Sequence, residues 1–182
     1  MIRLWSKSRQ VMQNSVCSKR LLLILAVGVV LICGLEIFCT RFKLAVVAGE
    51  SMLPTLRPGD LLIVDRRAYG YEQPRRDDIV VGRQGTGWIV KRVVGLPGEI
   101  VEVKKGTLFI NGAPRREKHP MRPGDLDIAE GKLFGGDFAT IGDNRAVPTM
   151  LAVQPILSRD EILGKVIFSA SLIPLDLLKP SG

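Results

Sequence analysis

Residues 88–99 read Trp-Ile-Val-Lys-Arg-Val-Val-Gly-Leu-Pro-Gly-Glu, and this stretch shows the pattern that decides the fold of most of the chain. A short run rich in β-branched residues ends at a Pro-Gly turn, which is typical of a strand. Similar runs recur throughout the chain beyond residue 41, at 44–47, 61–64, 79–81, 89–94, 100–103, 108–110 and 164–168. No long helical period separates them. The sequence therefore predicts a mainly β domain over residues 41–182, an antiparallel sandwich or barrel-like sheet.

Local turn signals support this prediction. Asn111-Gly112 follows the run 107–110, and Asn-Gly is the strongest short signal for a β-hairpin. Ser158 and Glu161 have the spacing of a capping box, which predicts a short helical turn. Residues 111–137 are rich in glycine, proline and charge, so we expect a long surface excursion there.

A different pattern precedes the β domain. Residues 21–40 read LLLILAVGVVLICGLEIFCT, with Glu36 as the single charge. A helix of about 20 residues is about 30 Å long, which matches the hydrocarbon core of a bilayer. A buried helix of a soluble protein usually has a polar face, and the apolar part of a cleavable signal peptide is usually only about 7–15 residues long. The sequence predicts an uncleaved transmembrane anchor at 21–40, after a basic tail at 1–20.

The charge of the chain is concentrated at its beginning. The 182 residues have a formal net charge of +8, and residues 1–20 carry five Lys or Arg residues and no acid. Only Arg41 and Lys43 follow closely after the span. The positive-inside rule therefore predicts a cytoplasmic tail and an extracytoplasmic domain. Because much of the positive charge lies outside the domain, the composition argues against nucleic-acid binding.

Cysteine and histidine usage excludes several kinds of site. All three cysteines precede residue 41, which excludes a cysteine nucleophile or a Cys-ligated metal in the β domain. His119 is the only histidine, so a site built from several histidines is excluded as well. Its position in the charged excursion indicates a solvated loop residue rather than a catalytic base. We expect no metal, nucleotide or other cofactor.

Three segments stand out as candidates for chemistry. Ser51 lies in a turn bounded by glycine and proline, Gly-Glu-Ser-Met-Leu-Pro-Thr-Leu-Arg-Pro-Gly-Asp over residues 49–60. Lys91 interrupts the apolar strand pattern, where alternation places it on one face with Ile89 and Val93. Residues 141–145 read Ile-Gly-Asp-Asn-Arg. Each segment alone is an ordinary feature of a β protein.

Taken together, the three segments resemble the type I signal peptidases, the serine–lysine proteases that remove signal peptides from exported proteins. The matching elements keep their order and spacing behind an N-terminal anchor. They are Ser51-Met52-x-Pro54-Thr55-Leu56 with Gly59-Asp60, Arg76-x-Asp78-Ile79-Val80-Val81, Lys91-Arg92-Val93-Val94-Gly95-Leu96-Pro97-Gly98, Gly142-Asp143-Asn144 and Ile162-x-Gly164-Lys165. The resemblance covers the anchor and the domain from about Val46 to Phe168.

The resemblance implies a role for each matched residue. Ser51 would be the nucleophile and Lys91 its general base, a role that requires a neutral amine and therefore an apolar setting, here provided by Trp88, Ile89, Val90 and Val93. The substrate would be a preprotein with small residues before the cut, bound beside the strand of Lys91. Met52, Leu56, Ile89 and Val90 would line its pockets, although plain core packing explains these four equally well. Arg92 and Asp143 match a charged pair that supports the site.

One segment departs from the family pattern. Where the family has a serine that orients the lysine, and then an acid and a base, this chain has Pro148, Met150 and Ala152. The neighbouring Thr149 could supply the missing hydroxyl, or water could hold Lys91 instead.

Three functions therefore stay open. The first is a signal peptidase, and the second is a peptidase of the same family specialised for a conjugation or pilus precursor. The third is an inactive, anchored β domain that binds exported peptides. Intact Ser51 and Lys91 favour an enzyme, whereas the altered segment favours the scaffold.

Overall fold

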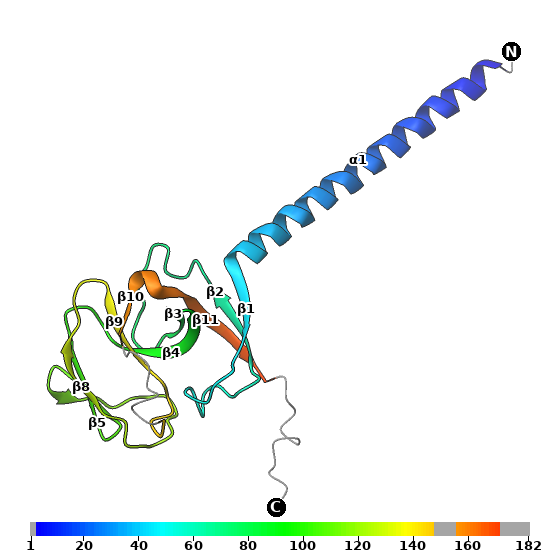
Figure 1. The fold of residues 1–182 in the computed structure, drawn as a ribbon. Coiled ribbons are helices and arrows are strands. Elements are labelled where there is room, and N and C mark those ends of the chain that lie inside the picture. Colours follow the sequence, from blue (N-terminus) through cyan, green and yellow to red (C-terminus); the bar gives the residue numbers. More distant parts are fainter. Residues whose placement is uncertain (1–2, 148–155, 172–182) are drawn as a thin grey trace, which may run out of the picture. The chain divides into compact units, whose positions relative to one another are not determined.

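The computed structural model describes residues 3–147 and 156–171, and the chain forms two compact units, Met1–Arg41 and Phe42–Gly182. Pro148, Thr149, Met150 and Ala152 lie outside the described residues. The prediction of a mainly β chain with one N-terminal helix is confirmed (Figure 1).

The first unit is the helix α1 (Arg3–Arg41). Its part from Arg20 to Arg41 has a mean hydropathy of 2.9, and none of this window is buried against protein. Among the described residues, it is the single helix that is long and apolar enough to cross a membrane. The large apolar side chains of this part are exposed, as expected of a membrane anchor that is surrounded by lipid. The exact limits predicted for the tail and the anchor stay predictions.

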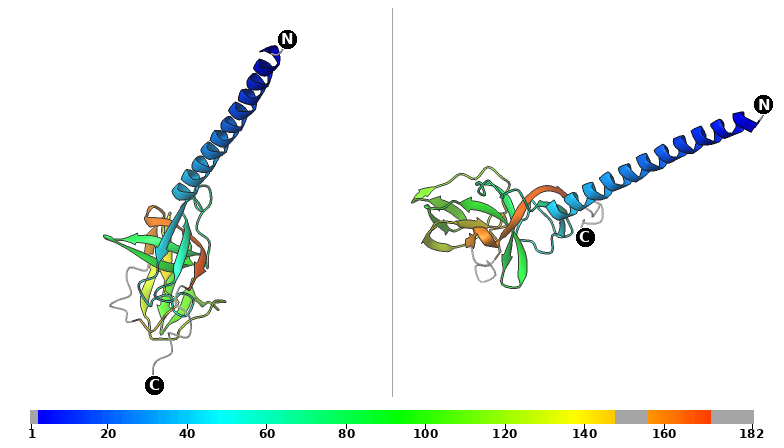
Figure 2. Two further views of the ribbon diagram at one scale, coloured as in Figure 1. Left: turned by 90° about the vertical axis from the view of Figure 1, so that its right-hand side faces the viewer. Right: turned by 90° about the horizontal axis from the view of Figure 1, so that it is seen from above.

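The second unit contains two antiparallel sheets (Figures 1 and 2). The larger sheet has seven strands in the order β1 (Phe42–Val46), β2 (Leu61–Asp65), β11 (Ile162–Ala170), β3 (Ile79–Gln84), β4 (Gly87–Gly95), β9 (Asp137–Ile141) and β10 (Ile156–Ser158). The smaller sheet has four, in the order β7 (Ala113–Pro114), β6 (Thr107–Ile110), β5 (Ile100–Lys104) and β8 (Ile128–Lys132). Each β-branched run named from the sequence overlaps one of these strands.

Both local turn predictions are confirmed. Ile110 pairs with Ala113 across the two-residue loop Asn111-Gly112, and both loop residues have positive φ angles, as a type I′ turn requires. The capping box joins Ser158 and Glu161 around the 3₁₀ helix η2 (Arg159–Glu161).

Strand β4 lies at the centre of the packing. Its residue Val90 packs against the apolar cluster around Met52, Leu56 and Val81. Its neighbours along the strand, Ile89 and Val93, belong to a second cluster with Val80 and Phe138, and Val94 belongs to a third between the sheets. Because both faces of β4 contact buried apolar residues, a polar side chain on this strand becomes partly buried.

The prediction of a surface excursion over 111–137 is wrong in part. The segment contains β7, β8 and the start of β9, and Leu126 and Leu133 are buried in the cluster between the sheets. It also runs along residues 142–146. The backbone amide of Arg122 donates to the Asp143 carbonyl, and that of Arg145 donates to the Arg122 carbonyl, both at 2.9 Å. A Cβ on Gly124 would lie 2.2 Å from the Arg145 carbonyl oxygen, so only glycine permits this approach.

Candidate active site

Ser51 lies in a tight turn that is anchored to the hydrophobic core. The Leu53 amide donates to the Glu50 carbonyl at 3.1 Å, and the Leu56 amide donates to the Met52 carbonyl at 2.9 Å. Met52 and Leu56 are each 1% exposed and fix the turn to the apolar cluster, while Ser51 is only half-buried. The serine is therefore presented by a rigid turn.

The segment after β9 packs directly on this turn. The Asn144 backbone amide donates to the Ser51 carbonyl at 2.9 Å, and its side-chain amide donates to the Glu50 carbonyl at 3.0 Å. A Cβ added to Gly142 would lie 2.2 Å from the Ser51 carbonyl oxygen and 3.3 Å from the Ser51 Cβ. Glycine at position 142 therefore allows Ser51 to approach the end of β9.

The sheet register relates Lys91 to the same point. Strand β4 pairs with β9 through Arg92 and Ile141, and the pairing ends there, next to Lys91 on β4 and Gly142 after β9. The turn of Ser51 packs on Gly142, so Ser51 and Lys91 both lie near the end of the paired part of β4 and β9.

The surroundings of Lys91 favour a neutral amine. Burial lowers the pKa of Lys91 below its ordinary value, while the Asp143 carboxylate opposes this shift in part. Among the described residues, no hydrogen bond or ion pair holds the Lys91 ammonium. Trp88, which was expected to contribute to the apolar setting, is 55% exposed and lies beside the Lys43 ammonium. Alternation along β4 explains this, since residues 88 and 91 point to opposite faces.

Arg92 and Asp143 form a buried ion pair with two hydrogen bonds. Arg92 Nε donates to Asp143 Oδ1 at 2.8 Å and Nη2 donates to Oδ2 at 2.6 Å, and the side chains are 7% and 1% exposed. The Thr55 hydroxyl also donates to Oδ2, at 2.5 Å. Both Asp143 oxygens are thus occupied, which fixes the carboxylate and offsets much of its charge.

The interpretation of His119 as a solvated loop residue is wrong. Its side chain is only 9% exposed, and Nε2 lies 3.4 Å from Asp143 Oδ1 and 3.5 Å from Glu117 Oε1. Neither ring nitrogen has a hydrogen-bond partner among the described residues. Burial, and then the Arg92 charge, lower the pKa of His119, so the ring is neutral at pH 7.

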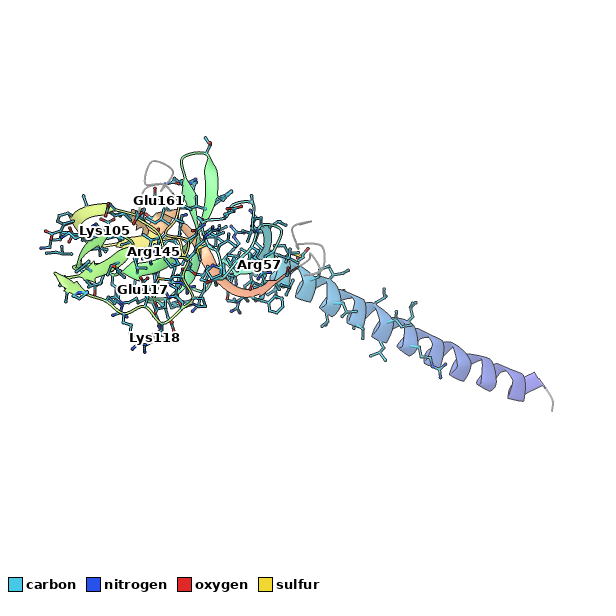
Figure 3. All side chains as sticks on the ribbon, turned by 90° about the horizontal axis from the view of Figure 1, so that it is seen from below. Arg57, Lys105, Glu117, Lys118, Arg145 and Glu161 are labelled. Atoms are coloured by element: carbon cyan, nitrogen blue, oxygen red, sulfur yellow. The ribbon has the colours of Figure 1, made fainter. Side chains whose placement is uncertain are left out.

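The reason for this burial is an ion pair that the sequence analysis did not identify. Arg145 Nη2 binds Glu117 Oε1 at 2.6 Å, with side chains 1% and 3% exposed. Arg145 also donates to the carbonyls of Gly142 and Gly106. Figure 3 labels Arg145, Glu117 and the adjacent Lys118 in this part of the domain. The pair brings residues 117–119 onto the segment that holds Ser51.

The residues expected to bind substrate divide into two groups. Met52, Leu56 and Val90 share one apolar cluster, whereas Ile89 packs against another. A separate pocket of about 400 Å³ opens beside Ser51, and it is lined by Gly49, Glu50, Ser51, Arg122, Asn144, Ala146 and Val147. Among the described residues, no group of three or more His, Cys, Asp and Glu side chains is arranged to hold a metal ion.

One edge of β4 is open next to Lys91. Strand β3 pairs with residues Gly87 to Arg92 of β4. Strand β9 pairs with β4 on the other edge, but only from Arg92 to Gly95. In the described part of the chain, no strand covers the other edge of residues 87–91. An extended peptide can add to this edge by main-chain hydrogen bonds.

Comparison with known proteins gives consistent matches. The family model described as signal peptidase, peptidase S26, matches residues 19–169. Signal peptidase I of Leptolyngbya laminosa is 33% identical over 153 residues, which cover 79% of this chain and 74% of the relative. Signal peptidase I of Bacillus caldolyticus is 33% identical over 158 residues, covering 78% and 85%. A crystal structure of a signal peptidase I from Enterococcus faecalis V583 aligns with 52% of this chain and 97% of its own at 24% identity, with a TM-score of 0.40.

Proposed function

Because the chain belongs to the signal peptidase family, peptidase S26, we propose that it removes signal peptides from exported preproteins with Ser51 as nucleophile and Lys91 as general base. The protein is a membrane-anchored peptidase of this family. The observation that supports the proposed dyad is the packing of the Ser51 turn on Gly142 at the end of β9, beside the buried Lys91 on β4, whose pKa is lowered by burial.

The lowered pKa matters because an ordinary lysine is a poor base at neutral pH. With a pKa of 10.5, only about one amine in 3,000 is neutral at pH 7. Desolvation of Lys91 increases this fraction, and the bonds from Arg92 offset part of the Asp143 charge that would hold the proton on the amine. The buried ion pair thus fixes residue 143 beside the base without restoring the ordinary pKa.

The proposed reaction proceeds through an acyl-enzyme. The neutral Lys91 amine accepts the Ser51 hydroxyl proton while Oγ attacks the scissile carbonyl carbon. The Lys91 ammonium then gives that proton to the leaving amine as the peptide C–N bond breaks. The amine next accepts a proton from water, which attacks the Ser51 ester, and Lys91 returns the proton to Ser51 as the signal peptide leaves.

The negative charge that develops on the carbonyl oxygen needs a donor. The Ser51 backbone N–H is the proposed donor, since Gly49 has no side chain to provide a second one. A Cβ on Gly49 would meet nothing within 4 Å, so the open space beside Ser51 leaves room for the substrate backbone.

Substrate binding follows from the open edge of β4. The residues before the cut would pair with the backbone of residues 87–91. Val90 and Ile89, on alternate faces of β4, would then contact small side chains, with the buried Met52 and Leu56 forming the apolar floor beneath Val90. The pocket with Arg122 and Asn144 lies beside Ser51 and provides space for the peptide around the cut.

The membrane helix places the protein where its substrates are. A signal peptide contains an apolar helix that enters the same bilayer. With five basic residues before the span, the proposed orientation has a cytoplasmic tail and an extracytoplasmic peptidase domain.

The proposal is tested with the purified full-length chain in detergent micelles and a radiolabelled preprotein. The wild type should cut the preprotein at its signal peptide, and Ser51→Ala and Lys91→Met should each abolish cutting, with no further loss in the double variant. Circular dichroism should show the same β content in all four proteins. Activity that survives either substitution would exclude the dyad. A wild type that binds the preprotein without cutting it would instead favour the inactive scaffold.

A further inference from the structure

Thr140 carries a buried hydroxyl without a partner. Its side chain lies in β9 and is 1% exposed, and its Oγ1 forms no hydrogen bond within the described residues. A buried hydroxyl that is left unpaired destabilises the fold relative to one that is paired. Such groups are rare in folded proteins, and they call for a structural or functional reason.

The sheet register relates this hydroxyl to Lys91. Thr140 pairs directly with Val93, and Lys91 lies two residues before Val93 on the same strand. All three side chains therefore leave the sheet on one face. Thr140 and Lys91 are diagonal neighbours, a relation in which Cα atoms are about 7–8 Å apart and long side chains reach each other.

From this arrangement we propose that Thr140 is a positioning residue, whose hydroxyl accepts a hydrogen bond from the Lys91 amine and directs the amine toward Ser51. The inference rests on the proposed dyad and adds a residue that acts through Lys91.

The chemistry of a neutral amine explains the need for such a residue. The amine has two N–H donors and one lone pair, and the lone pair must face the Ser51 hydroxyl to take its proton. An acceptor for one of the N–H groups fixes this orientation. Asp143 is already bound by Arg92 and Thr55, whereas Thr140 Oγ1 has no hydrogen-bond partner among the described residues and lies on the face of Lys91.

The altered segment after Asn144 gives a second reason to expect that Thr140 orients Lys91. Pro148 stands where the family pattern has a serine, and proline has no hydroxyl to offer. Thr149 is the rival source, and it lies outside the described residues. Thr140 has the advantage that its hydroxyl is buried, lies on the strand next to β4 and has no partner in the part of the chain that the structure describes.

The decisive variant is Thr140→Val, because valine keeps the shape of threonine and removes the hydroxyl. We expect kcat to fall about ten-fold with an unchanged KM, as loss of one orienting hydrogen bond predicts. The melting temperature should fall only slightly, because valine keeps the shape of the side chain and a single hydrogen bond is removed. The acidic limb of the kcat profile should move to lower pH, since the ammonium loses an acceptor that stabilises it.

Three further variants make the test specific. Thr140→Ser keeps a hydroxyl and should restore most of the rate, whereas Thr140→Ala should reproduce the loss even if valine disturbs folding. Thr107→Val removes an exposed hydroxyl at the start of β6, in the other sheet, and should change neither rate nor pH profile.

The proposal is overturned if Thr140→Val and Thr140→Ala keep the wild-type kcat and pH profile. It is also overturned if serine is as slow as valine, or if Thr149→Val alone produces the whole loss. These outcomes differ from failure of the dyad, which would appear as cleavage by Ser51→Ala.

Discussion

At the scale of single residues, the protonation of Lys91 depends on two opposing influences. Burial among apolar neighbours disfavours its charge, whereas the Asp143 carboxylate favours it. Arg92 reduces the second influence because it occupies both oxygens of Asp143. The lysine is thus desolvated beside an acid that is already paired, and its pKa is lowered, as the proposed role of a general base requires.

The pH dependence of cleavage should therefore report Lys91. Because the proposed active form is the neutral amine and its pKa is lowered, activity should be retained below pH 10.5 and fall as the pH drops through the lowered pKa. Kinetics of kcat/KM across acidic to alkaline pH would measure this limb. Lys91→Arg should be inactive at every pH, because guanidinium stays protonated. A profile without an acidic limb, or an active arginine variant, would contradict the proposed base.

His119 shows why single-residue predictions have a limit. Its neighbours in sequence, Lys118 and Pro120, indicate a solvated loop, and nothing local reports the buried ion pair of Glu117 with Arg145. That contact joins residues 28 positions apart and carries His119 toward Asp143. The motifs of Ser51 and Lys91 were visible because their spacing is fixed by a family pattern, whereas the environment of His119 depends on a non-local contact particular to the fold.

At the scale of elements, strands were predictable where β-branched residues run together. Strands β2, β3, β4 and β5 are of this kind. Strand β8 reads Ile-Ala-Glu-Gly-Lys and has no such run, yet it pairs with β5 because Leu133 after it is buried between the sheets. Tertiary packing determines the structure of such segments, and local β propensity does not predict it.

The junction of β9 with the Ser51 turn leads to a prediction about Gly142. A methyl group there would lie 2.2 Å from the Ser51 carbonyl oxygen, so Gly142→Ala must push the turn away. A displacement of about 1 Å at a reacting group can cost about 100-fold in rate. We expect a loss of this size in kcat/KM, with β content unchanged by circular dichroism.

The matched control for that prediction is Gly131→Ala on β8. A Cβ at Gly131 meets nothing within 4 Å, so the same chemical change should leave the rate unaffected. Equal rates for Gly142→Ala and the wild type would show that the contact between the turn and β9 is not needed for catalysis.

At the scale of the whole molecule, the chain joins an apolar helix to a β domain with a polar site. The helix exposes apolar side chains over the whole span Arg20–Arg41, and the domain buries its own apolar clusters in 42–182. The hydrocarbon core of a bilayer can cover the exposed apolar side chains of the helix. The helix thus needs lipid to cover its apolar side chains, whereas the domain buries its own. Each unit was recognisable from its own pattern of hydropathy.

The orientation of the molecule in the bilayer is the prediction that connects these units to function. Residues 1–20 carry five basic side chains, against Arg41 and Lys43 just after the span, so the tail should stay in the cytoplasm. In sealed right-side-out vesicles, an added protease should digest epitopes beyond residue 41 and leave an N-terminal epitope tag intact. Inverted vesicles should give the opposite result, and detergent should expose both ends. Digestion of the N-terminal tag in intact right-side-out vesicles would reverse the orientation, and Ser51 would then lie on the side where preproteins are made rather than where their signal peptides emerge.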